Sequence, residues 1–143
     1  MTVSAIRVNP FFAASTLPFQ APPFDEIEEG DYQPAIEEGM RQQIAEVAAI
    51  IDNPAAATFD NTIVALERSG ELLNRVLHVF SAITGANTSD ALQKLQEDEA
   101  PLLAAHEDSI FLDPRLFKRL EQVYSQREAL SLDAESSKLL DWY

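Results

Sequence analysis

Two histidines, His78 and His106, are the first residues to consider for metal binding or acid–base catalysis, because the 143-residue chain has no others. His106-Glu107 begins like the zinc-binding pattern in which two histidines at i and i+4 share one helical face. The fourth residue after His106 is Ile110, and the fourth after His78 is Ala82, so the second ligand is missing in both cases. We interpret both histidines as ordinary residues on the surface or boundary of helices.

Carboxylates are the other chemistry-bearing groups, and Glu97, Asp98 and Glu99 form a run with Glu107 and Asp108 nearby. Dimetal helical bundles need inward carboxylates from several helices together with Glu-x-x-His pairs, and no glutamate precedes either histidine by three residues. We interpret the run as a solvated acidic face. The chain also lacks a G-x-S-x-G elbow and a glycine-rich phosphate loop. The sequence therefore predicts no catalytic, cofactor-binding or metal-ligating residue.

Composition narrows the function classes further. The net charge of −14 disfavours binding to nucleic acid or to an anionic membrane, because like charges repel. There is no cysteine, which excludes disulfides and thiolate metal sites. No apolar run approaches the roughly 18 residues of a membrane span, and the first residues do not follow a signal-peptide pattern. We expect a cytoplasmic protein.

The elements that carry these residues are predicted to be helices. Apolar residues recur at steps of three and four, which favours an all-α fold: an antiparallel bundle of four to five helices over 31–143. An extended proline-rich arm over 1–30 precedes it, and its aromatic residues are expected to be buried against another surface. Capping residues and prolines place the helices at about 31–52, 58–85, 89–112, 114–130 and 134–143.

The stretch 58–85 is predicted to be one continuous helix of about 40 Å in the middle of the bundle. It is apolar over more than half of its circumference, so it must be covered on more than one side. Pro101 is expected to kink the helix over 89–112. The residues expected to face inward on the other helices are Ile36, Met40, Ile44, Val47, Ile51, Leu92, Leu95, Leu102, Ile110, Leu116, Phe117, Leu120, Val123 and Tyr124.

Several stretches resemble the amino-terminal region of the thimet oligopeptidase family of zinc metallopeptidases. They are NPFFAASTLPFQAPPFDEI (9–27), QPAIEEGM (33–40), TFDNTIVALERSG (58–70) and LDPRLFKRLEQVYSQREALSLDAES (112–136). TFDNTIVALERSGELLNRV (58–76) followed by TGANTSDALQKLQ (84–96) is similar to the bacterial branch of that family, the peptidyl-dipeptidases.

The resemblance implies an all-helical enzyme that removes dipeptides from the C-termini of short peptides, with zinc held in a deep channel between two helical halves. The His-Glu-x-x-His signature of the family is absent from these residues, so no catalytic or metal role carries over to them. The implied role is a segment of the channel wall, inactive alone, whose partners are the remainder of the enzyme and short peptides. The helical rhythm continues to Tyr143, which favours a piece of a longer chain; the alternative is a free-standing acidic helical module that binds another protein.

Overall fold

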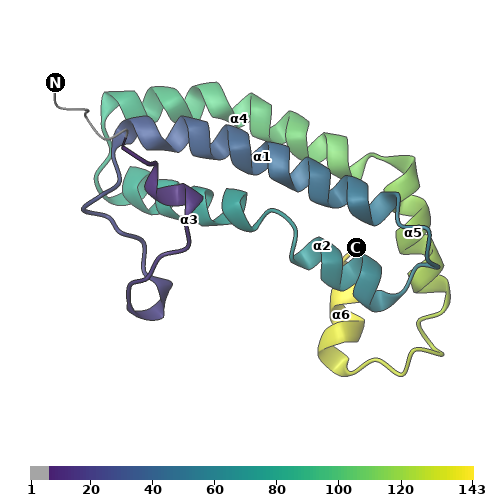
Figure 1. Cartoon of the computed structure of the whole chain (residues 1–143). Helices are drawn as coiled ribbons and strands as arrows, with labels where there is room; N and C mark the ends of the chain where they lie inside the picture. Colours follow the sequence, from purple (N-terminus) through teal and green to yellow (C-terminus); the bar gives the residue numbers. More distant parts are fainter. Residues whose placement is uncertain (1–6) are drawn as a thin grey trace, which may run out of the picture. The chain divides into compact units, whose positions relative to one another are not determined.

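The computed structural model describes residues 7–143, and helices are the only regular secondary structure in that range (Figure 1). This confirms the predicted all-α fold. The elements are η1 (Pro10–Phe12), η2 (Pro18–Gln20), α1 (Glu29–Ile51), η3 (Phe59–Val64), α2 (Ala65–Glu67), α3 (Glu71–Ala86), α4 (Asp90–Phe111), α5 (Pro114–Ser125) and α6 (Ala134–Trp142).

The helices form two compact units that share α1 and α4. Unit 1 contains the described residues up to Gln42 together with Gly70–Pro101, and unit 2 contains Gln43–Ser69 with Leu102–Tyr143. In unit 1, Tyr32 of α1 packs between Phe11 and Phe80, with ring centroids 5.4 and 5.1 Å apart. In unit 2, two clusters of buried side chains form the core: Val47, Ile50, Leu66, Ile110 and Leu116 in one, and Ala57, Ile63, Val123 and Leu140 in the other.

The prediction of one continuous helix over 58–85 is wrong. A π-helical turn, η3, leads into the short α2, and the chain then breaks at Gly70, whose φ of 73° is left-handed. A glycine adopts that conformation without the clash that a Cβ causes, so Gly70 permits the break. The polar residues of this stretch are nevertheless on an exposed side: Glu67, Glu71, Asn74, His78 and Ser81. Its apolar residues Leu72, Leu73, Val76 and Phe80 are buried. The apolar pattern thus located the burial correctly without locating the break.

The buried stripe of α1 also differs from the predicted one. Ile36 and Val47 are buried as predicted. Ile44, which was expected to face inward, is exposed, and Ile50, which was not, is buried. Gly39 lies on the buried face because α3 approaches there: a Cβ on Gly39 would lie 2.8 Å from the Cα of Leu73. The pattern of apolar residues did not reveal this buried face, because one of its members is a glycine.

The predicted N-caps are confirmed. Thr58 and Asn61 form a reciprocal capping box, with hydrogen bonds of 2.8 and 3.1 Å. Asp113 and Asp133 each accept a backbone N–H of the first turn at 2.8 Å, and Ser89 accepts that of Leu92 at 3.2 Å. These side chains satisfy donors that have no partner within the helix, and they fix where η3, α4, α5 and α6 begin.

Four inward or outward assignments and one helix end are corrected. Helix α5 ends at Ser125 rather than near 130. Three residues that were expected to face inward are exposed: Leu102, Phe117 and Tyr124. Arg119, whose charge predicts an outward position, is buried. Helix α4 continues through Pro101, and the expected kink there stays a prediction.

The proline-rich segment is anchored to unit 1 at its beginning. Arg7 donates to both carboxylate oxygens of Asp31 at 2.6 and 2.8 Å and also to the carbonyl of Glu26. Asn9 donates to the carbonyl of Asp31 at 2.8 Å, and Arg75 of α3 donates to the carbonyl of Phe11 at 2.7 Å. Phe11 is therefore buried against the chain's own helices, and two 3₁₀ turns interrupt the segment that was expected to be extended.

Candidate functional site

The two histidines lie in different environments. His78 is exposed on α3, as predicted, whereas His106 on α4 is buried and its Nε2 lies 2.7 Å from Oε1 of Gln43. Burial lowers the pKa of His106, because the charged imidazolium loses its solvation. A neutral, hydrogen-bonded histidine of this kind is a structural group. Gln43 in turn donates to Ser69 over a long 3.5 Å, which does not activate the serine.

The acidic run of α4 is only partly the solvated face that was predicted. Glu97 and Asp98 are exposed, but Glu99 is 2% exposed, and its Oε2 is buried without a hydrogen-bond partner. Burial raises the pKa of Glu99, and the negative charges of Glu37 and Asp98 raise it further. The interpretation of Glu99 as a surface residue is therefore wrong.

Zinc does not fit the residues that the structure describes. Over 7–143, no group of three or more histidine, aspartate, glutamate or cysteine side chains is placed to hold a metal ion. His78 belongs to unit 1 and His106 to unit 2, and the buried imidazole is already hydrogen-bonded to an amide.

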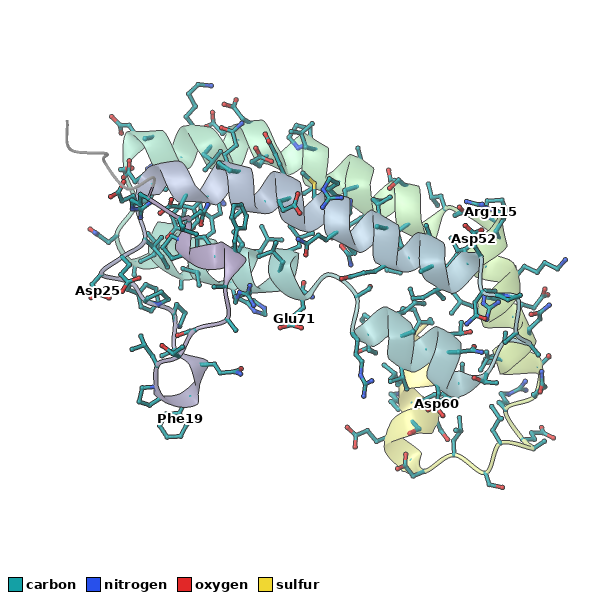
Figure 2. The ribbon with its side chains drawn as sticks, in the orientation of Figure 1. Phe19, Asp25, Asp52, Asp60, Glu71 and Arg115 are labelled. Atoms are coloured by element: carbon teal, nitrogen blue, oxygen red, sulfur yellow. The ribbon has the colours of Figure 1, made fainter. Side chains whose placement is uncertain are left out.

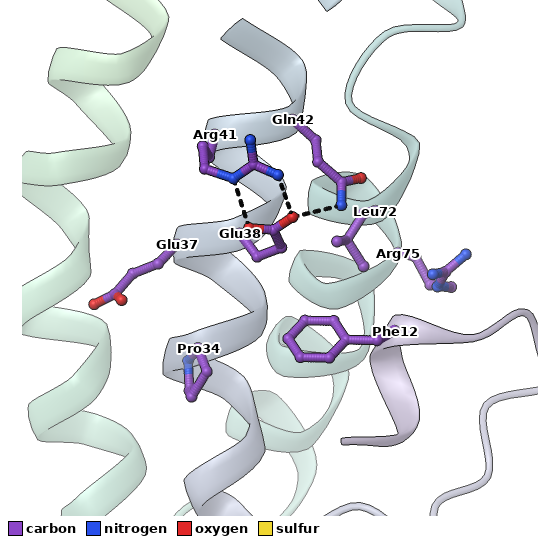
Figure 3. Close-up of a pocket in the computed structure, with 8 residues that line it drawn as sticks. All are labelled: Phe12, Pro34, Glu37, Glu38, Arg41, Gln42, Leu72 and Arg75. Atoms are coloured by element: carbon purple, nitrogen blue, oxygen red, sulfur yellow. Dashed lines mark hydrogen bonds and ion pairs between the residues drawn. The ribbon is translucent and has the colours of Figure 1, made fainter. Parts of the chain in front are cut away.

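A groove in unit 1 is lined by both charged and apolar side chains. It has a volume of about 610 Å³ and lies between α1, α3 and the 3₁₀ turn η1 (Figure 3). Its lining combines carboxylates, guanidinium groups and apolar side chains: Phe12, Pro34, Glu37, Glu38, Arg41, Gln42, Leu72 and Arg75.

Three polar residues of this groove, Glu38, Arg41 and Gln42, are hydrogen-bonded to one another, whereas the Nε of Arg75 is buried without a hydrogen-bond partner. Arg41 donates to the two carboxylate oxygens of Glu38 at 2.7 and 2.6 Å, and Gln42 donates to one of them at 2.8 Å. The hydrogen bonds from Arg41, followed by that from Gln42, lower the pKa of Glu38 to about 2. A carboxylate this acidic is a poor proton acceptor at neutral pH. Glu38 is therefore unsuited to act as a general base.

A second groove, in unit 2, is more apolar and has a volume of about 400 Å³. Helices α5 and α6 line it with Phe117, Leu120, Glu121, Tyr124, Leu140, Asp141 and Tyr143. The exposed rings of Phe117 and Tyr124 belong to this surface, which explains why they follow the inward-facing period of α5 without being covered.

Sequence reasoning missed the two arginines that tie distant segments together. Arg75 holds the carbonyl of Phe11, and Arg119 donates to the carbonyls of Asn53 and Ala55 at 2.9 and 3.4 Å. Arg119 also donates to Oδ1 of Asn61 at 3.2 Å. Charge alone placed Arg119 on the outer face, and only the carbonyls of a loop far away in sequence reveal its role.

Two curated proteins match this chain along nearly its whole length. It is 50% identical to the dipeptidyl carboxypeptidase of Escherichia coli over 134 residues, which are 94% of this chain and 20% of the relative. It is 49% identical to the dipeptidyl carboxypeptidase of Salmonella typhimurium over 136 residues, which are 95% of this chain and 20% of that relative. The resemblance to bacterial dipeptidyl carboxypeptidases is confirmed. The chain spans about one fifth of the length of these relatives.

Two further searches gave negative results. No protein-family model matches the chain. Among the described residues, no helix is both long enough and apolar enough to cross a membrane.

Proposed function

We propose that this chain forms one helical portion of a peptidase that removes dipeptides from the C-termini of short peptides. The observation that carries the proposal is the identity of 50% along 94% of the chain with a dipeptidyl carboxypeptidase. Identity that extends this far includes surface positions as well as the core, and it therefore supports a shared role within the larger enzyme as well as a shared fold.

In this proposal the chain is part of the channel wall and carries no reacting group. In the polar groove of unit 1, Glu38 is held ionised by hydrogen bonds from Arg41 and Gln42, so it is unsuited to take up a proton. Zinc and the groups that act with it belong to other residues of the enzyme. Short peptides are the substrates, the remainder of the enzyme is the partner, and the cytoplasm is the proposed location.

The test is a hybrid enzyme. In the dipeptidyl carboxypeptidase of Escherichia coli, the matching fifth is replaced by this chain, and the release of dipeptides from a blocked tripeptide is measured. The hybrid is expected to retain activity within about tenfold of the parent, whereas the same enzyme without that fifth is expected to be inactive. A folded hybrid that binds zinc but cleaves nothing would contradict the proposal.

The alternative is a free-standing acidic module that binds another protein. The net charge of −14 and the polar lining of the unit 1 groove are compatible with it. The hybrid distinguishes the two functions. A free-standing module is not expected to restore activity to a peptidase that lacks the matching fifth of its chain. This chain alone is expected to show no turnover of the blocked tripeptide and no stoichiometric zinc by elemental analysis.

A further inference from the structure

We propose that the closed loop Ser15–Ala21 is a docking element whose Phe19 ring enters an apolar pocket in the remaining four fifths of the enzyme. The inference rests on the proposed function and adds to it a named contact. It divides the proline-rich segment into a part that packs on the chain's own helices and a part that presents an aromatic anchor.

The loop is held closed by its own hydrogen bonds. Ser15 Oγ donates to the carbonyl of Ala21 at 2.6 Å and accepts the N–H of Leu17 at 3.2 Å. Within the loop, Gln20 N–H donates to the Leu17 carbonyl at 3.0 Å and Ala21 N–H to the Pro18 carbonyl at 3.2 Å. The proline also fixes one backbone angle next to Phe19. The loop is thus preorganised, which reduces the entropy lost when it binds.

Phe19 is presented at the tip of this loop in a strained conformation (Figure 2). Its φ is 59° and that of Gln20 is 54°, so two successive residues with side chains adopt the left-handed region. A bulky residue there is an outlier, and such strain persists where the surrounding structure or a bound partner maintains it. The Phe19 side chain is 103% exposed, whereas Phe11 of the same segment is 3% exposed.

The groove beside the loop in unit 1 is only partly apolar. This groove, between the loop and α3, has a volume of about 400 Å³, and Phe19 is among the residues that line it. The other lining residues include the apolar Ala14, Pro22 and Val79, but also charged and polar side chains of α3: Glu71, Arg75 and His78. A phenyl ring turned into this groove would desolvate charged groups without pairing them. The ring therefore points to a partner surface outside these helices.

The length of the relatives identifies that partner. This chain matches one fifth of them. Under the proposed function, the other four fifths of the enzyme pack against part of the surface that is exposed in this chain. Aromatic anchors that fill a pocket dominate such interfaces, and a preorganised loop with one exposed ring fits that description. The pocket is expected to be apolar and about the size of a phenyl ring.

Chymotrypsin tests the inference, because it cleaves after an accessible phenylalanine. The Phe19–Gln20 bond is followed by mass spectrometry in the free chain and in the hybrid with the Escherichia coli enzyme, under native conditions. The bond is expected to be cut at least tenfold more slowly in the hybrid. Equal rates in an active hybrid would overturn the inference and leave the proposed function intact. A hybrid that neither folds nor cleaves peptides would contradict both.

A substitution provides an independent measurement. Phe19→Ser is expected to leave the thermal midpoint of the free chain unchanged, since the ring touches nothing there, and to lower the midpoint of the hybrid. Val8→Ser is the matched control, because Val8 is 73% exposed in the same segment but lies outside the closed loop. An equal effect of Phe19→Ser on the free chain and the hybrid would show that the ring has no partner in the enzyme.

Discussion

At the scale of single residues, several buried side chains are polar or charged, and the apolar pattern of the sequence does not predict their burial. Asp31, Glu99, His106 and Arg119 are each buried, and three of them are paired: Asp31 with Arg7, His106 with Gln43, and Arg119 with loop carbonyls. The pairing with Arg7 lowers the pKa of Asp31. Glu99 has no such pairing, and its Oε2 is buried without a hydrogen-bond partner; the Nε of Arg119 is also unpaired, although its two terminal nitrogens donate hydrogen bonds.

Glu99→Gln is therefore expected to stabilise the chain at neutral pH. The substitution removes a carboxylate whose ionised form is disfavoured by burial and by two nearby negative charges. The amide has the same shape and is equally unpaired, so the gain comes from loss of the charge alone. The free energy of unfolding is measured by urea denaturation at pH 7.5. Glu97→Gln is the control, because Glu97 is exposed two residues earlier on the same helix, and it is expected to change little.

The gain should depend on pH in a defined direction. The pKa of Glu99 is raised in the folded chain, so between the unfolded and folded pKa values the native state holds a proton that the unfolded state has released. The contribution of Glu99 to stability is then complete below the unfolded pKa and is lost as the pH rises through the folded one. Glu99→Gln should have little effect at pH 4 and its full effect at pH 7.5. A pH-independent loss of stability would contradict this account.

Arg119→Lys tests the opposite kind of buried group. Lysine cannot span the carbonyls of Asn53 and Ala55 together with Oδ1 of Asn61, so the loop before η3 loses donors that it has in the native chain. We expect a loss of about 1–3 kcal/mol in unfolding free energy and faster hydrogen exchange over 53–61. Arg127→Lys is the control, since Arg127 is exposed after the end of α5. Equal, small effects of both substitutions would show that the hydrogen bonds of Arg119 do not stabilise the loop before η3.

At the scale of elements, the closest helix contact of unit 1 depends on a missing side chain. A Cβ at Gly39 would lie 2.8 Å from Cα and 2.9 Å from N of Leu73, and backbone atoms cannot yield as a flexible side chain can. Gly39→Ala is expected to push α1 and α3 apart and to cost about 1–3 kcal/mol.

Gly85→Ala is the control for that substitution. Gly85 also lies within a helix, but nothing lies within 4 Å of the Cβ that alanine would add. Alanine there should stabilise the chain by about 0.5–1 kcal/mol, because glycine is a poor helix former. Thermal unfolding of the two variants should therefore shift in opposite directions. Shifts of the same sign would mean that the approach of α1 to α3 is less close than described.

The sequence predicted the parts of this fold that depend on local chemistry. Thr58, Ser89, Asp113 and Asp133 cap helices as their residue types and positions indicated, because capping satisfies donors within one turn. The break at Gly70 was missed, since an isolated glycine within a periodic stretch is compatible with a continuous helix. The buried face of α1 was misplaced, because Gly39 and Gln43 belong to it and neither is apolar.

For the candidate site, the sequence was sufficient to reject known catalytic and metal-binding motifs, but it did not reveal which residues line the grooves. The spacing after His78 and His106 was sufficient to reject a zinc motif. The polar groove of unit 1 joins η1 to residues of α1 and α3 more than 20 positions later, and no local pattern encodes such an encounter. The strained presentation of Phe19 depends on backbone angles that composition does not reveal.

At the scale of the whole molecule, each unit has its own core. The aromatic contacts of Phe11, Tyr32 and Phe80 lie in unit 1, and both of the apolar clusters described for unit 2 lie within it. The two units share the backbones of α1 and α4 but not these side chains. Regions with separate cores can open separately, with different free energies.

Two core substitutions should therefore reduce hydrogen-exchange protection in different places. Gly39→Ala is expected to increase exchange mainly in α3, because its clash is with Leu73. Leu140→Ala removes a buried side chain of unit 2, which costs about 2–5 kcal/mol, and it should increase exchange mainly in α5 and α6. Hydrogen exchange with mass spectrometry on both variants measures this directly. A uniform loss of protection along the chain in either variant would mean that α1 and α4 couple the two cores into one cooperative unit.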